Sequence, residues 1–124
     1  MYKFYNPNPD RKLVGDCVIR AISTITGADW ESVYTNLAFQ GLLMRDMPSS
    51  NAVWGTLLAN KGFKREVIPN TCPECYTIRD FCNDYQIGAY IVATGSHVVA
   101  VIDGDYYDTS DSGDEIPIYY WRKI

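Results

Sequence analysis

The segment 98–108 constrains the fold most strongly, because it has the pattern of a tight β-hairpin. Val98–Ile102 is an unbroken apolar run typical of a buried strand, and the short stretch Asp105–Asp108 follows it. Asp103-Gly104, between the two, favours a two-residue type I′ turn, because both turn positions need a positive φ. We therefore expect two adjacent antiparallel strands whose register is set by this turn.

The length of the turn decides which acid meets His97, the only histidine of the chain. With a two-residue loop, Asp108 lies on the same face as His97 and is its diagonal neighbour. With a three-residue loop the register moves by one residue, and Asp111 faces His97 instead. Either register places a carboxylate beside the imidazole, so the hairpin supplies a base and an acid, and a nucleophile is expected upstream.

A cysteine stands at the start of the first predicted helix. Asp16 is a predicted N-cap, apolar residues follow at helical spacing, and Gly27 provides a left-handed stop. Cys17 is then the first helical residue, where the positive end of the helix dipole lowers the pKa of a thiol. In the two-residue register we expect Tyr106 to face this helix and Tyr107 to point away from it.

The composition indicates a single domain over residues 1–124 with no preference for nucleic acid or membrane. The apolar share is 47%, and a net charge of −4 without a Lys/Arg cluster argues against nucleic acid or anionic membranes as partners. No apolar run has the ~18 residues of a membrane span, and residues 1–7 lack the layout of a signal peptide. We therefore expect a cytoplasmic protein whose four cysteines are reduced thiols.

The remaining chain predicts helices first and strands last. After an extended lead-in over residues 1–15, we expect helices over residues 17–26, 29–44, 51–62 and 78–85, and strands over residues 63–68, 89–93, 98–102, 105–108 and 116–121. This order is typical of an α+β domain, in which the N-terminal helices pack on a small C-terminal antiparallel sheet.

The pair Cys72 and Cys75 is a rival candidate for chemistry. A Cys-x-x-Cys pair can be half of a zinc site or a redox pair. A structural zinc needs four ligands, and Cys82 falls on the apolar face of its predicted helix, so no second pair completes the site. The acidic loop 110–115 lacks the regular ligand spacing of a calcium site. We expect no metal and no cofactor, and we interpret Cys72 and Cys75 as plain loop thiols.

The chain contains candidates for the three roles of a catalytic triad, in the order Cys17, His97 and Asp108. These residues would act as nucleophile, general base and orienting acid. The sequence resembles the papain-like cysteine peptidase superfamily at three places: Gly15-Asp16-Cys17, Ser96-His97-Val98-Val99 and Tyr106-Tyr107-Asp108. The relatives nearest in size are compact bacteriocin leader peptidases and phage- or bacterium-encoded papain-like proteins. The resemblance implies a papain-like fold and a triad of Cys17, His97 and Asp108, with Asp111 as the alternative acid.

The oxyanion hole is the point at which the sequence departs from that superfamily. Its members usually carry a Gln or Asn several residues before the nucleophile, whereas Arg11 and Lys12 lie near that spacing here. Asn8, further off, is the candidate partner, and the backbone N–H of Cys17 can supply one donor.

The resemblance implies hydrolysis of a protein or peptide by a thiol hydrolase. One alternative is a catalytically silent papain-fold module that binds or inhibits a partner, for example a phage-encoded protein that targets a host protein. A second alternative is acyl transfer or deamidation by the same triad. A third interpretation needs no catalysis: Cys17 is a small core residue and His97 is structural.

Overall fold

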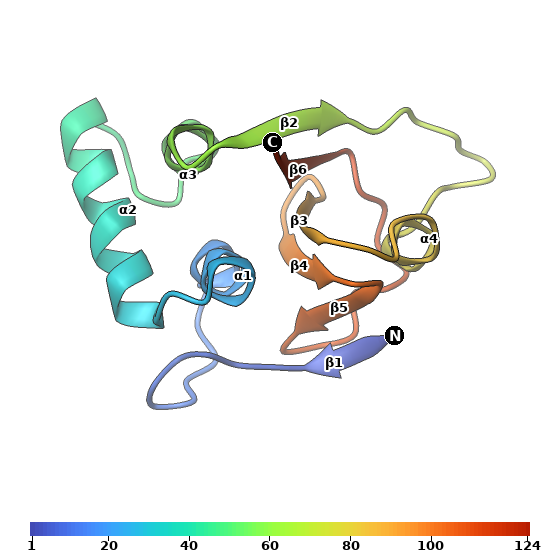
Figure 1. Cartoon of the computed structure of the whole chain (residues 1–124), viewed down its shortest axis with the longest axis horizontal. Helices are drawn as coiled ribbons and strands as arrows, with labels where there is room; N and C mark the ends of the chain where they lie inside the picture. The colour runs from blue at the N-terminus through green and yellow to red at the C-terminus, as the bar shows by residue number, and fades with distance from the viewer.

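The computed structural model describes all 124 residues, which form four helices and a six-stranded mixed sheet (Figure 1). In chain order the elements are β1 (Tyr2–Phe4), α1 (Cys17–Thr26), α2 (Trp30–Met44), α3 (Asn51–Asn60), β2 (Phe63–Val67), α4 (Ile78–Asp84), β3 (Ala89–Ala93), β4 (Val98–Ile102), β5 (Asp105–Asp108) and β6 (Tyr119–Lys123). The strand order is β1-β5-β4-β3-β6-β2, in which β1 and β5 run parallel and all other neighbours antiparallel. The expected α+β class is confirmed.

Helices cover both faces of the sheet. Helix α1, with α2 and α3 beyond it, lies on one face, and α4 lies on the other (Figure 1). Strand β4 therefore alternates between two cores: Val98 and Ala100 pack into the core under α1–α3, whereas Val99 and Val101 pack into the core under α4. Burial on both faces explains why this strand is an unbroken apolar run rather than an alternating one.

The register of the β4–β5 hairpin confirms the two-residue turn. Ile102 pairs with Asp105, and the two residues between them, Asp103 and Gly104, have φ values of 50° and 82°. Both turn positions are thus in the left-handed region that a type I′ turn requires. The three-residue alternative is wrong.

The expected orientation of the two tyrosines of β5 is wrong. Tyr106 is 1% exposed and packs into the core under α4, while Tyr107 packs against the core under α1. The period of a strand shows which residues share a face, but both faces of this sheet carry a helix. Which helix covers which face is therefore a property of the packing and not of the strand pattern.

The sheet is larger than expected, because it recruits strands from outside the C-terminal region. Strand β1 comes from the segment expected to be an extended lead-in, and β2 pairs with β6 at the opposite edge. Strand β6 begins at Tyr119 rather than at residue 116. Pro117 lies in the part that was expected to be strand and has no N–H to donate to a ladder.

A disulfide joins Cys72 and Cys75 in the connection between β2 and α4, so the expectation of four reduced thiols is wrong. The Cα atoms of the two cysteines are 4.1 Å apart in a turn that is closed by a hydrogen bond from Thr71 Oγ1 to the Glu74 carbonyl. The prediction of reduced cysteines came from the expected compartment, which takes no account of how close two cysteines lie in the folded chain. Cys17 and Cys82 are free thiols.

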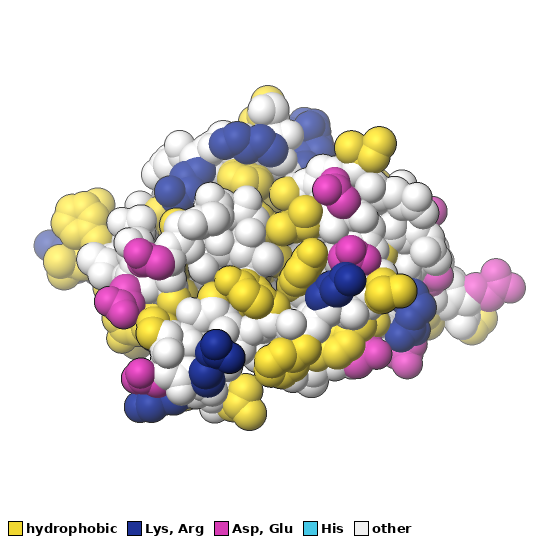
Figure 2. Space-filling view, turned by 60° about the horizontal axis from the view of Figure 1, so that its bottom comes forward, with side chains coloured by type: hydrophobic (Ala, Val, Ile, Leu, Met, Phe, Trp, Pro, Cys, Tyr) yellow, Lys and Arg dark blue, Asp and Glu magenta, His cyan; other side chains and the backbone are white.

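The surface shows no concentration of charge of one sign on the face seen in Figure 2, where acidic and basic side chains are scattered among apolar ones. None of the four helices is both long enough and apolar enough to cross a lipid bilayer. No group of three or more His, Cys, Asp or Glu side chains is placed to hold a metal ion.

The hairpin turn provides a test of the fold. A side chain at Gly104 would have to adopt a φ of 82°, and its Cβ would lie 3.3 Å from the Cys82 carbonyl oxygen. We expect Gly104→Ala to lower the free energy of unfolding by roughly 1–2 kcal/mol, the cost of a left-handed conformation for an L-residue. Urea denaturation followed by circular dichroism measures this change.

The matched control is Gly95→Ala, where an added Cβ meets no atom within 4 Å. This variant should stay within about 0.5 kcal/mol of the wild type. Equal losses in the two variants would contradict the assignment of the turn.

Candidate active site

Cys17 is the first residue of α1 and lines a cavity of about 420 Å³. The cavity lies between the start of α1, the region where α2 leads into α3, and the loop that joins β3 to β4. Its lining contains Asp16 but no Lys or Arg, and its larger side chains are mostly apolar or aromatic, as at Tyr34, Leu37 and Tyr119. A volume of this size lies within the range of sites for small molecules or for one or two side chains of a peptide.

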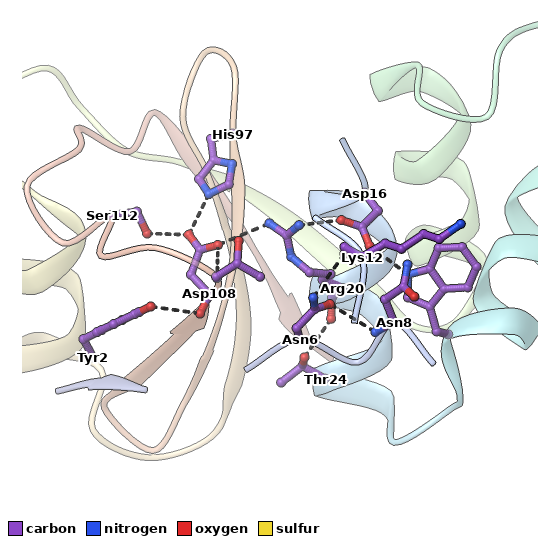
Figure 3. Close-up of polar contacts among 12 residues, drawn as sticks. Tyr2, Asn6, Asn8, Lys12, Asp16, Arg20, Thr24, His97, Asp108 and Ser112 are labelled. Atoms are coloured by element: carbon purple, nitrogen blue, oxygen red, sulfur yellow. Dashed lines mark hydrogen bonds and ion pairs between the residues drawn. The ribbon is translucent and has the colours of Figure 1, made fainter. Parts of the chain in front are cut away.

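His97 lies in the loop just before β4 and lines the same cavity. Its Nε2 is 2.7 Å from Oδ2 of Asp108, the last residue of β5 (Figure 3). The Cys17 thiol lines the same cavity, and Cys17 and His97 each shift the pKa of the other. Because Nε2 is engaged by Asp108, Nδ1 is the ring nitrogen left for the thiol. The structure therefore brings Cys17, His97 and Asp108 together in that order.

The Asp108 carboxylate is 2% exposed and accepts four hydrogen bonds. His97 Nε2 and Ser112 Oγ, at 2.7 and 2.8 Å, bind Oδ2. The backbone N–H of Thr109 and the guanidinium of Arg20, at 2.7 and 3.2 Å, bind Oδ1. Burial raises the pKa of Asp108, but the hydrogen bonds from His97 and Ser112 outweigh it and hold this pKa below its ordinary value.

Strand β1 holds the backbone of Asp108 in place. The Tyr2 hydroxyl and the Tyr5 backbone N–H both donate to the Asp108 carbonyl, at 3.2 and 3.0 Å. The N-terminal segment thus closes the outer edge of β5 at the residue that orients His97. No sequence pattern predicted this role, because three residues are too few to show a strand period.

The electrostatics of the pair favour a thiolate next to an imidazolium. Burial raises the pKa of the Cys17 thiol, but the hydrogen bond and charge of His97, the backbone N–H of Val98 and the charge of Arg20 together lower it below its ordinary value. The hydrogen bonds to Asp108 and to Cys17 raise the pKa of His97 to about 10, against the opposing effect of burial. Each group thus stabilises the charged form of the other.

The two other candidates from the sequence lie elsewhere. Asp111 accepts hydrogen bonds from the Tyr106 hydroxyl and the Gly113 backbone N–H, and it does not contact His97. Asn8 is buried, but its Oδ1 accepts from the Asp10 backbone N–H within its own turn, and it is not among the residues that line the cavity. Asn8 is therefore not positioned to stabilise an oxyanion at Cys17.

Sequence analysis missed the buried guanidinium of Arg20, which bridges the carboxylates of Asp16 and Asp108. Only one sequence feature indicated this ion pair: Arg20 is a basic residue in an apolar helix and lies four positions after Asp16. It also missed Asn51, whose Oδ1 accepts from Trp54 Nε1 at 3.0 Å. An indole nitrogen can only donate, so the free amide group of Asn51 is Nδ2, a donor.

Comparisons of the chain with protein-family models, with curated proteins and with solved structures find no match. A functional assignment therefore depends on the chemistry of the site. A thiol with a lowered pKa, an imidazole in the same cavity and a buried carboxylate bound to that imidazole form the arrangement that activates a cysteine for attack on an acyl carbon.

The site predicts selective reaction of one thiol. We expect iodoacetamide at about pH 6 to modify Cys17 well before Cys82, because the pKa of Cys17 is lowered whereas burial raises the pKa of Cys82 to about 11. His97→Ala should slow the modification of Cys17 and narrow its lead over Cys82, because the Cys17 pKa returns toward or above that of an ordinary thiol. Peptide mapping by mass spectrometry after timed quenching measures both rates.

The direction of the pH dependence follows from the same shifts. In the wild type, the rate of Cys17 alkylation should persist as the pH falls below the ordinary thiol pKa. In His97→Ala, the rate of Cys17 alkylation should fall over that interval. A Cys17 rate that declines in step with the rate for His97→Ala would contradict an ion pair at this site.

Proposed function

We propose that this chain is a small papain-like cysteine peptidase that cleaves a protein or peptide with a triad of Cys17, His97 and Asp108. The observation that carries the proposal is that Cys17 and His97 line one cavity, while His97 Nε2 is held 2.7 Å from the buried Asp108 carboxylate. A structural histidine needs no thiol on its second nitrogen, and a cysteine that only fills the core does not line an open cavity.

In the first half of the reaction, the Cys17 thiolate attacks the carbonyl carbon of the scissile peptide bond and forms a C–S bond, while one electron pair moves to the oxygen. Collapse of this intermediate breaks the C–N bond, and the leaving amine takes a proton from the His97 imidazolium. The products of this half are a thioester on Cys17 and a free amine. Asp108 holds the ring orientation throughout and stabilises its cationic form.

In the second half, neutral His97 takes a proton from water as the water oxygen attacks the thioester carbon. The C–S bond breaks, the Cys17 thiolate leaves, and the acyl group departs as a carboxylic acid. The imidazolium is restored, so the thiolate–imidazolium pair is ready for the next substrate.

The oxyanion is stabilised by the start of α1. The first N–H groups of a helix have no partner within the helix, and Asp16, at the N-cap position, makes no side-chain capping hydrogen bond. The N–H of Cys17 is thus available to the developing negative charge, together with the positive end of the helix dipole. Asn51 Nδ2 is the side-chain amide donor that lines the same cavity.

The substrate class follows from the cavity lining. The lining contains no Lys or Arg, and its larger side chains are apolar or aromatic, as at Tyr34, Leu37 and Tyr119. An extended polypeptide with an uncharged, apolar side chain next to the scissile bond fits this surface. An acidic side chain would have no cation to pair with among the lining side chains other than the catalytic imidazolium.

The direct test is incubation of the purified chain with a complex peptide mixture, followed by labelling of new N-termini. A peptidase generates new termini next to apolar residues, and Cys17→Ser generates none. New isopeptide or amide links without new termini would indicate acyl transfer. Conversion of Asn or Gln to acid without chain cleavage would indicate deamidation. No product of any kind from a chain whose Cys17 labels rapidly would indicate a binding module and overturn the proposal.

The identity of the triad acid gives a second prediction. Asp108→Asn should lower kcat by at least ~10-fold, because the imidazolium loses its counter-charge and the ring loses its preferred tautomer. Asp111→Asn, whose side chain is 52% exposed and away from His97, should leave kcat close to the wild-type value. Both are measured on a peptide identified in the mixture, below the melting temperature of each variant. Equal effects of the two substitutions would exclude Asp108 as the orienting acid.

A further inference from the structure

Arg20 occupies a position where a basic side chain is rare. It is 8% exposed, on the second turn of α1, and its guanidinium lies between the carboxylates of Asp16 and Asp108 (Figure 3). Those two carboxylates are themselves 5% and 2% exposed. Burial of charge is costly unless the charge is paired and hydrogen-bonded. A planar guanidinium with a fixed fork of donors can bind both acids at once, which an ammonium group does less well.

Asp16 stands at the N-cap position of α1, but it does not act as a cap. Its φ and ψ are −112° and 26°, outside the extended conformation usual for a cap, and its side chain makes no hydrogen bond to the helix backbone. Instead Oδ1 accepts from Arg20, and Oδ2 accepts from Trp30 Nε1 at 2.9 Å. The predicted capping role of Asp16 is therefore wrong. Its carboxylate is held away from the helix backbone by hydrogen bonds from Arg20 and Trp30.

The diverted cap changes the chemistry beside Cys17. A capping carboxylate would accept hydrogen bonds from the first N–H groups of α1 and place a negative charge next to the thiolate. With Asp16 bound to Arg20 and Trp30, no side chain caps those N–H groups, and the cation of Arg20 lowers the pKa of the Cys17 thiol. Both effects favour an anion at Cys17 and at the oxyanion position.

We propose that Arg20 is a positioning residue with two linked roles: it draws Asp16 away from the start of α1, leaving the backbone donors there free for an oxyanion, and it holds Asp108 against His97. The second role follows from geometry, since Arg20 binds Oδ1 of Asp108 while His97 binds Oδ2. One guanidinium thus couples the helix that carries the nucleophile to the strand that carries the acid. This inference rests on the proposed function for its catalytic consequence, but its effect on the thiol does not.

The experiment measures the pH profile of Cys17 alkylation in three variants. Arg20→Met removes the guanidinium but keeps much of its apolar volume, so Asp16 is free to cap the helix. We expect alkylation at about pH 6 to slow at least ~10-fold, because the thiolate loses a cation and gains a neighbouring carboxylate. The double variant Arg20→Met with Asp16→Ala has no side chain to cap α1, and it should recover a substantial part of the lost rate.

Removal of Asp16 also relieves the buried charge that Arg20→Met leaves unpaired, so the melting temperature of each variant is measured beside the alkylation rate. If Arg20 only stabilised the fold, the rate would follow the melting temperature across the variants. A positioning role requires the rate to fall and recover among variants that are fully folded at the assay temperature. Arg122→Met is the matched control: Arg122 forms an ion pair with Glu66 on β2 and does not line the cavity. It should leave the profile unchanged. If Arg20→Met does not fold, Arg20→Lys, which keeps the charge but not the fork, is measured in the same way.

A wild-type profile in a folded Arg20→Met or Arg20→Lys variant would overturn the proposal. A slow thiol that Asp16→Ala fails to speed would also overturn it. On a cleaved peptide, Arg20→Met should lower kcat by about 10²-fold, the scale of losing an oxyanion donor, with KM changed little. The alkylation profile does not require turnover, so failure of the peptidase proposal and failure of the Arg20 proposal give different results.

Discussion

The buried carboxylate of Asp108 is the interaction on which the site depends. It accepts from His97, Ser112, Thr109 and Arg20, and these donors come from three separate parts of the chain. A carboxylate that is 2% exposed would be unstable without such donors, because its desolvation is not recovered otherwise. These hydrogen bonds stabilise the buried charge of Asp108. The bond from His97 also orients the imidazole, and the bond from Arg20 connects α1 to β5.

Helix α1 contributes both to the apolar core and to the buried charged network. Helix α1 packs on β4 through Ala21 and Ile22, while its other flank carries Arg20 toward the hairpin. Its β-branched content makes it a poor helix in isolation, so packing on both sides must hold it. Correct placement of Cys17 thus depends on the hydrophobic core and on the Asp16–Arg20–Asp108 network together. Loss of either would displace the thiol from His97.

Two of the features that the sequence did not predict depend on residues far apart in the chain. The bridge from Arg20 to Asp108 spans 88 positions, and β1 reaches β5 across more than 100. Asp16 is of a residue type that often caps helices, but its carboxylate accepts hydrogen bonds from Arg20 and Trp30 instead of from the helix backbone. Asn8 was the nearest residue of a suitable type that the sequence offered as an oxyanion donor, but its Oδ1 accepts from the Asp10 backbone N–H in a local turn.

The sequence by itself determined two local elements: Cys17 at the start of a helix that Gly27 terminates, and the two-residue turn at Asp103-Gly104. The turn dipeptide also favoured the register that places Asp108 beside His97, with Asp111 left as the alternative, and the structure decided for Asp108. Only the tertiary structure decided which helix covers each face of the sheet, where Asp16 turns and what neutralises Asp108. The partners of Asp16 and Asp108 depend on which donors reach each buried carboxylate once the chain is folded. The helix on each face depends on packing. A local sequence pattern predicts neither.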